Sequence, residues 1–282
     1  MARYTAFAIH LALSLLIVGA LLGISILLWF PSPLFEIDGG WSGLRIVALV
    51  DLVLGPLLTL VVFRAGKPGL KMDMGIIVTI QVAALSYGVW TLHHNRPVLL
   101  VYADDLIKPI PASVVQDVDP EGRLRERFGN EFPIKLAIPI PLDPEQGSPY
   151  LLKRVLSETP LHLHTEDYVR LSEWWPEVTA DSLNIQDYAA RKPDWQQALD
   201  HSLAELKRPI DELVFLPIKG RKKSGIVIAE ATSGDFVGFI DIPFFPEWGS
   251  RRVPLKERLA SAMPPIGPDQ PAPRTSTSAT DI

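Results

Sequence analysis

The sequence contains no cysteine among its 282 residues. Disulfide bonds, thiol catalysis, iron–sulfur clusters and cysteine-ligated zinc are therefore excluded. The formal net charge is −5, which implies no basic face large enough to hold nucleic acid. Because nucleic-acid binding depends on neutralising phosphates with lysine and arginine, we expect no nucleic-acid partner.

Specific catalytic motifs are also missing: there is no G-x-S-x-G, no P-loop and no H-E-x-x-H. His162 and His164 with Glu166 have a spacing that suits a metal on a strand face, but a solvated surface is the simpler interpretation. Asp104-Asp105 fits a turn at a strand end better than an acid–base pair. We therefore expect no enzymatic activity and no metal or cofactor.

Charged residues are scarce in the first third of the chain, which contains three apolar stretches: Phe7 to Phe30, Leu44 to Phe63 and Met74 to Leu92. A bilayer core of about 30 Å needs about 20 apolar residues in helical form. Each stretch satisfies this, so three transmembrane helices are predicted. The first is too long for a signal-peptide core and ends in Trp-Phe-Pro-Ser-Pro, which favours a retained anchor.

The flanking charges predict the orientation of these helices. Basic residues flank one side of the membrane and acidic residues the other: Arg3, Arg64, Lys67 and Lys71 against Glu36 and Asp38. The positive-inside rule then puts the N-terminus and the 64–73 loop in the cytoplasm. Three crossings then place everything after His94 outside, which in a bacterium with two membranes is the periplasm. Trp29, Trp41 and Trp90 fall at the outer helix ends, as interfacial aromatics do.

Asp51 is the most informative polar residue in the predicted membrane part. A carboxylate about two turns inside a span is costly and marks a functional site by default. One interpretation is that Asp51 is protonated or hydrogen-bonded to Ser25, Ser86 or Tyr87, which lie near the same depth, and only locks the bundle. The other is that it faces a partner helix carrying a cation or donor.

Small residues predict where helices approach closely. Gly19 and Gly23 form a G-x-x-x-G pair in the first span, and Ala84 and Gly88 form a similar pair in the third. Such pairs also arise by chance, since small residues are frequent in membrane spans.

Gly55 and Pro56 interrupt the second span one turn after Asp51. Proline removes a backbone hydrogen bond and bends a helix. We therefore expect the second span to be bent at this point.

The remaining chain predicts an α+β domain with a mostly antiparallel sheet. The expected strands cover residues 96–103, 134–140, 213–218, 225–231 and 235–242, the last two forming a hairpin around 232–234. The expected helices cover residues 149–157, 165–174 and 192–206. The organisation is therefore a transmembrane domain over 1–95, a periplasmic domain over 96–255 and a disordered tail over 256–282.

Two further surface features have alternative interpretations. Trp174-Trp175 fits core or turn packing, with an exposed partner-binding pair as the alternative. Arg221-Lys222-Lys223 fits a charged loop between strands, which an acidic partner would complement.

One stretch has a recognisable pattern. It reads DLVLGPLLTLVVF from Asp51, then Gly66-Lys67-Pro68, Asp73, QVAALSYG from Gln81, Arg96-Pro97 and Val101-Tyr102. Over about residues 45–105 this resembles the TfpX/TfpZ family of type IV pilin accessory proteins, since D-x-x-L-G-P-L-L-T-L is not generic membrane composition. Residues 213–217 and 232–243 also resemble that family's C-terminal part, less distinctively.

The resemblance implies an inner-membrane protein that acts as a pilin-specific chaperone or as a modulator of pilus assembly and dynamics. Its expected partners are the major type IV pilin, through both its membrane helix and its periplasmic head, the lipid bilayer, and other pilus assembly proteins. Two alternatives remain open: a membrane-anchored, ligand-binding accessory subunit of a sensor or transporter, and a membrane-bound periplasmic enzyme.

Overall fold

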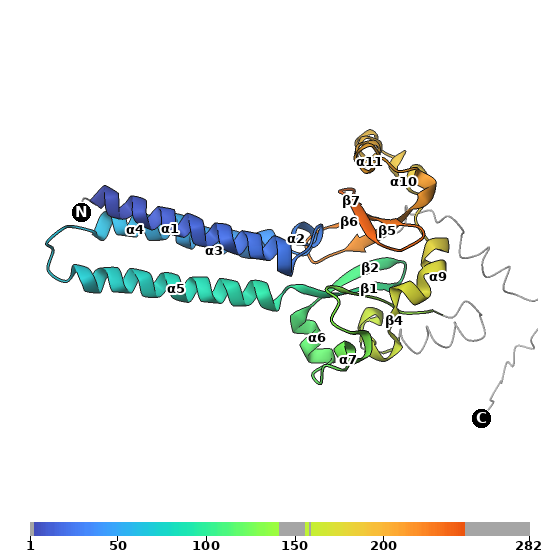
Figure 1. Cartoon of the computed structure of the whole chain (residues 1–282), viewed down its shortest axis with the longest axis horizontal. Coiled ribbons are helices and arrows are strands. Elements are labelled where there is room, and N and C mark those ends of the chain that lie inside the picture. The colour runs from blue at the N-terminus through green and yellow to red at the C-terminus, as the bar shows by residue number, and fades with distance from the viewer. Residues whose placement is uncertain (1–2, 141–155, 158, 246–282) are drawn as a thin grey trace, which may run out of the picture.

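The computed structural model describes residues 3–140, 156, 157 and 159–245. A long helical bundle forms one end of the molecule and a sheet domain forms the other (Figure 1). Three helices are long and apolar enough to cross a membrane, namely Arg3–Trp29, Gly40–Val62 and Leu70–His94. The three predicted spans are therefore confirmed as helices.

The first two spans are not uniform α-helices. α1 (Arg3–Ile24) continues as a π-helical segment, Ser25–Trp29. The second span consists of α3 (Gly40–Ala48), a π-helical segment (Leu49–Leu54) and α4 (Gly55–Val62), and the third is α5 (Leu70–His94). A short helix, α2 (Leu34–Ile37), lies between the first two spans.

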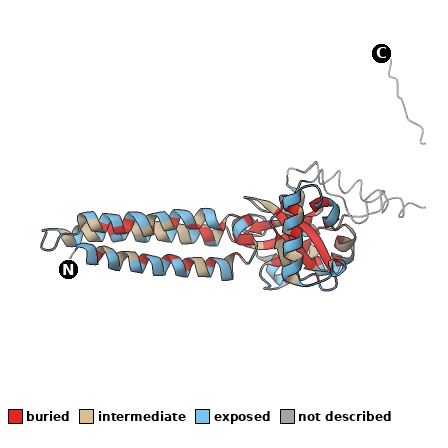
Figure 2. Cartoon of the chain, turned by 90° about the horizontal axis from the view of Figure 1, so that it is seen from above, coloured by how far each residue is buried: buried red, intermediate tan, exposed pale blue. Residues whose placement is uncertain are grey.

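The surface of the bundle is apolar. Leu16, Leu27 and Val61 are 69%, 78% and 76% exposed, and Figure 2 shows that burial is concentrated in the sheet domain. Large apolar patches are rarely left in contact with water by soluble proteins. The bundle therefore has the surface expected of helices that face lipid.

The sheet has seven strands among the described residues, in the order β4-β3-β1-β2-β5-β6-β7. Their bounds are β1 Pro97–Ala103, β2 Leu106–Pro111, β3 Ile134–Ala137, β4 Val169–Arg170, β5 Leu213–Lys219, β6 Ser224–Glu230 and β7 Phe236–Ile240. The β1–β3 and β2–β5 pairs are parallel, and the other four are antiparallel. The sheet is thus mostly antiparallel, as predicted, but mixed.

The β1–β2 hairpin confirms the turn interpretation of Asp104-Asp105. Both residues have positive φ, 55° and 60°, as a tight two-residue hairpin turn requires. Strand β2 is not predicted from local sequence, because it contains Pro109 and Pro111, which cannot donate to a ladder. The structure tolerates them because β2 pairs with β5 only at Ile107.

Helices cover both faces of the sheet. α10 (Ile185–Ala189) and α11 (Pro193–Leu206) pack on β5–β7, while α6 (Ala112–Val118) and α7 (Arg123–Phe128) lie beside β1 on the same face. α9 (Trp175–Ala180) packs against the opposite face. This explains why β1 and β5 are apolar along almost their whole length.

One predicted helix is wrong. Residues 165–174 form two 3-10 turns, Thr165–Asp167 and Leu171–Trp174, on either side of β4. The segment extends because β4 pairs with the edge of β3, which local spacing does not reveal. Most of the predicted helix at 149–157 and the whole 256–282 tail lie outside the described residues.

A single apolar core joins the bundle to the sheet domain. It runs from Leu21, Val47 and Leu92 of the three spans, through Phe30 and the α2 segment, to the face of the sheet that carries Leu216. The other face of the sheet has two separate cores under α10–α11 and α6–α7. The bundle and the sheet domain are therefore packed together rather than connected only by a tether.

Candidate functional site

A cavity of about 430 Å³ lies between the three spans and opens on one side of the bundle. Its walls are mainly apolar, but all three spans contribute polar groups: His10, Ser14, Asp51, Thr59 and Gln81. Polar groups in a membrane are expensive and face the bundle interior or a partner. This cluster is the candidate functional site of the membrane part.

Asp51 lies on the π-helical segment of the second span and is 5% exposed. Within the described residues its carboxylate has no hydrogen bond to Ser25, Ser86 or Tyr87. Ser25 is buried with its hydroxyl unpaired, whereas Ser86 and Tyr87 are exposed on α5. The predicted hydrogen bond from Asp51 to one of these three residues is therefore wrong, and Asp51 instead borders the cavity.

His10 and Thr59 connect α1 to α4 across the cavity. The His10 Nδ1 atom lies 2.6 Å from the Thr59 hydroxyl, which donates to the Gly55 carbonyl at 3.1 Å. The Thr59 hydroxyl has one proton, so both contacts are hydrogen bonds when Thr59 donates to Gly55 and the His10 Nδ1 carries a proton. Sequence reasoning missed both residues, although a histidine in an apolar span is a detectable signal.

Glycines allow the second and third spans to approach closely. A Cβ at Gly55 would collide with the Gln81 side chain, and one at Gly88 would collide with Val47. In contrast, a Cβ at Gly19 or Gly23 would meet nothing within 4 Å. The G-x-x-x-G pair of α1 therefore makes no close helix–helix contact with the described part of the chain. Ala84 is half-buried on α5, one turn before Gly88.

Pro56 occupies the first turn of α4, directly after the π-helical segment. The irregularity expected in the second span thus takes the form of a π-helical turn that contains Asp51. Such turns accompany distortions in helices and are frequent at functional sites.

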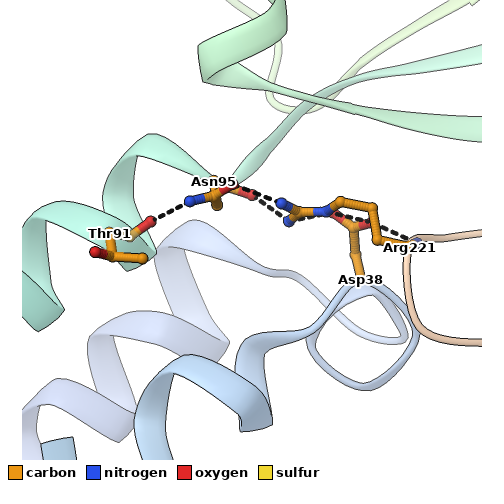
Figure 3. Close-up of polar contacts among 4 residues, drawn as sticks. All are labelled: Asp38, Thr91, Asn95 and Arg221. Carbon is orange, nitrogen blue, oxygen red and sulfur yellow. Dashed lines mark hydrogen bonds and ion pairs between the residues drawn. The ribbon is translucent and has the colours of Figure 1, made fainter. Parts of the chain in front are cut away.

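A second polar site joins the membrane part to the sheet domain. Arg221, in the turn between β5 and β6, donates from Nε and Nη2 to the two carboxylate oxygens of Asp38 at 3.2 and 2.9 Å (Figure 3). Its Nη1 and Nη2 also donate to the side-chain and backbone oxygens of Asn95 at 2.6 and 2.7 Å. One guanidinium thus connects the segment between the first two spans to the end of the third.

The remainder of this turn packs against the same segment. The backbone N–H groups of Lys222 and Lys223 donate to the Ile37 carbonyl at 3.0 and 3.2 Å. The Lys223 ammonium lies 3.0 Å from a Glu36 oxygen. The predicted charged loop between two strands is confirmed. Its basic side chains pair with acidic residues of this same chain, Asp38 and Glu36, which the sequence pattern alone does not reveal.

Asp38 is buried, with its side chain 0% exposed, whereas the Arg221 side chain is 37% exposed. Burial raises the pKa of Asp38, and the hydrogen bonds and charge of Arg221 oppose this rise. We call Asp38, Arg221 and Asn95 the joint. Its hydrogen bonds and ion pair offset the desolvation of the Asp38 carboxylate, which is buried between the helical bundle and the sheet domain.

The structure also places the histidine–glutamate group and the tryptophan pair identified from the sequence. Among the described residues, no group of three histidine or acidic side chains is arranged to hold a metal. His164 is 6% exposed, so its predicted surface position is wrong. Trp175 is buried and donates from Nε1 to the Ala231 carbonyl at 2.8 Å, which confirms its packing role.

Similar proteins are found among the fimbrial assembly proteins of Dichelobacter nodosus. The chain is 33% identical over 103 residues to the one of serogroups C1 and C2, covering 36% of this chain and 78% of that protein. This chain belongs to the fimbrial assembly protein family. The fimbrial assembly proteins of serogroups E1 and I are equally similar over 103 residues, but the match covers only 40% of each. No family model and no solved structure matches the chain.

Proposed function

We propose that this protein acts in the bacterial inner membrane as a pilin-specific chaperone or modulator of type IV pilus assembly and dynamics. The observation that carries the proposal is its similarity to proteins named for fimbrial assembly. The three apolar helices support a position in the membrane, where pilins wait before assembly.

The proposed orientation has the N-terminus in the cytoplasm and the sheet domain in the periplasm. The basic loop between α4 and α5 lies at the end of the bundle far from the sheet, which supports this orientation (Figure 1). Trp29, Trp41 and Trp90 lie at the ends of the spans that adjoin the sheet domain. Tryptophan favours such membrane–water boundaries.

In this proposal a pilin contacts both the helical bundle and the sheet domain. A pilin has an apolar helix in the bilayer and a globular head outside it. The shared core and the joint hold the bundle and sheet domain together, so both can contact one pilin at the same time. Linking two contacts raises the effective concentration of the second, so each can remain weak enough for release.

The intramembrane cavity is the proposed contact for the pilin helix. Its rim includes Leu13 of α1 and Val82 of α5, which are 56% and 57% exposed, so it opens sideways towards lipid. Asp51 borders this opening without an internal hydrogen-bond partner in the described chain. A cation or hydrogen-bond donor on an incoming helix would satisfy it.

The first test compares total pilin and surface pili in a deletion strain and its complemented parent. A fall in total pilin supports a chaperone, and a fall in surface pili alone supports an action on assembly or retraction. Unchanged levels of both would reject the proposal and favour a ligand-binding accessory subunit.

The second test is Asp51→Asn, measured by the amount of pilin that co-purifies with the protein. Loss of a charge-assisted hydrogen bond costs about 1.5–3 kcal/mol, so the amount of co-purified pilin is expected to fall by at least about ten-fold. Asp73→Asn is the control, because this residue pairs with Lys67 at the other end of α5 and does not line the cavity. Equal recovery from both variants would contradict the assignment of Asp51.

A further inference from the structure

A second cavity, of about 340 Å³, lies where α5 leaves the bundle. Its walls come from the end of α5, the start of β1, and the α6 and α7 region. His93 and His94, the last residues of the third span, form part of the wall. The Trp90 ring stacks on His94 at 5.0 Å between centroids and is 56% exposed, as expected at the level of lipid headgroups.

Two arginines line this cavity and have no counter-ion among the residues that the structure describes. Arg96 and Arg125 both line it, and within the described residues neither forms an ion pair. Burial, and then the positive charge of Arg125, lower the pKa of Arg96. The Arg96 Nη1 donates to the His93 carbonyl at 2.5 Å, which fixes the guanidinium beside the end of α5.

The acidic residues of the cavity do not neutralise this pair. Asp119 accepts hydrogen bonds from the backbone N–H groups of Arg123 and Leu124 at 3.0 and 2.9 Å. Glu131 is the other acid among the lining residues, and it is exposed to solvent. An added anion would therefore relieve the repulsion between Arg96 and Arg125.

The rest of the cavity is suited to more than a small anion. Val98, Val115, Phe132 and Ile134 provide an apolar wall next to the arginines. Phe132 is 41% exposed although it is a large aromatic residue. A ligand with a negatively charged head and an apolar body could pair with the arginines and pack against the apolar wall at the same time. The position beside the membrane exit supplies such molecules at high local concentration.

We propose that this cavity binds the headgroup of an anionic phospholipid, with its phosphate between Arg96 and Arg125. Arginine binds phosphate oxygens with paired, charge-assisted hydrogen bonds. The glycerol and upper acyl carbons then lie against Val98 and Phe132. The bound lipid adds a contact between the sheet domain and the bilayer to those made by the shared core and the joint.

The test uses the purified full-length protein in neutral detergent, titrated with phosphatidylglycerol, phosphatidylcholine or inorganic phosphate. Native mass spectrometry measures the retained lipid, and thermal unfolding measures the stabilisation. Phosphatidylglycerol is expected to be retained in preference to phosphatidylcholine. Arg125→Gln, an exposed position that should not disturb folding, is expected to weaken this binding about ten-fold because a charged hydrogen-bond donor is lost.

Arg123→Gln is the matched control, because it lies on the same helix but outside this cavity and pairs with Glu121 on the surface. It should bind phosphatidylglycerol as the wild type does. Equal binding by Arg125→Gln and Arg123→Gln would overturn the proposal. Stabilisation by inorganic phosphate alone, equal to that by phosphatidylglycerol, would overturn the assignment of a lipid and identify a free-anion site.

Discussion

Replacing Arg221 with alanine should open the joint between the bundle and the sheet domain. The Asp38 carboxylate has 0% side-chain exposure and would lose both guanidinium contacts. Removing one partner of a buried ion pair costs about 3–5 kcal/mol because the remaining charge stays desolvated. Asp38→Ala should cost less, about 1–3 kcal/mol, since the Arg221 side chain is 37% exposed and water can solvate it.

Hydrogen exchange measures this opening locally. The Lys222 and Lys223 N–H groups bond to the Ile37 carbonyl, so their exchange reports separation of the turn from the membrane part. In Arg221→Ala they should exchange at least about 100-fold faster, given about 1.4 kcal/mol for each factor of ten. The β1 amides, which lie in the sheet, should keep their protection in this variant.

Two comparisons decide whether the reasoning holds. Lys223→Gln removes only an exposed ion pair with Glu36 and Asp241, worth about 0–1 kcal/mol, and should accelerate exchange much less. The double variant Asp38→Ala/Arg221→Ala should be more protected than Arg221→Ala alone, because no buried charge is left unpaired. If Arg221→Ala exchanged no faster than Lys223→Gln, the buried carboxylate would not be the source of the stability.

Two further predictions concern pH and helix packing. Burial, and then Lys108, lower the pKa of His162 from 6.5 to about 4, so the folded state binds fewer protons than the unfolded state between these values. The free energy of unfolding should therefore fall as pH drops from 6.5 towards 4, by on the order of 2 kcal/mol, in denaturant titrations. His162→Gln should make this decrease smaller by about the same amount, whereas His201→Gln, at an exposed site on α11, should leave it unchanged. Gly88→Ala should destabilise the bundle by about 1–3 kcal/mol, because its Cβ meets the stiff Val47 side chain, whereas Gly19→Ala should not lower the melting temperature in detergent.

The sequence by itself determined the three apolar helices and the hairpin formed by β6 and β7. Span length follows from bilayer thickness. The signals for β6 and β7 are local, since two apolar runs are separated by Thr232-Ser233-Gly234, with Gly234 at a φ of 75°. The depth of Asp51 was also readable, since it depends only on counting along one helix. These features share one property: each depends on residues near one another in the chain.

Only the tertiary structure decided which groups meet. Arg221 and Asp38 are 183 residues apart, and neither spacing nor periodicity encodes their pairing. The same holds for β4, whose extended form depends on β3, and for His10, which meets Thr59 only after the spans pack. Local propensity is weak compared with the free energy of burial and of satisfying polar groups. The polar sites of this protein therefore arise from contacts between segments that are distant in the sequence.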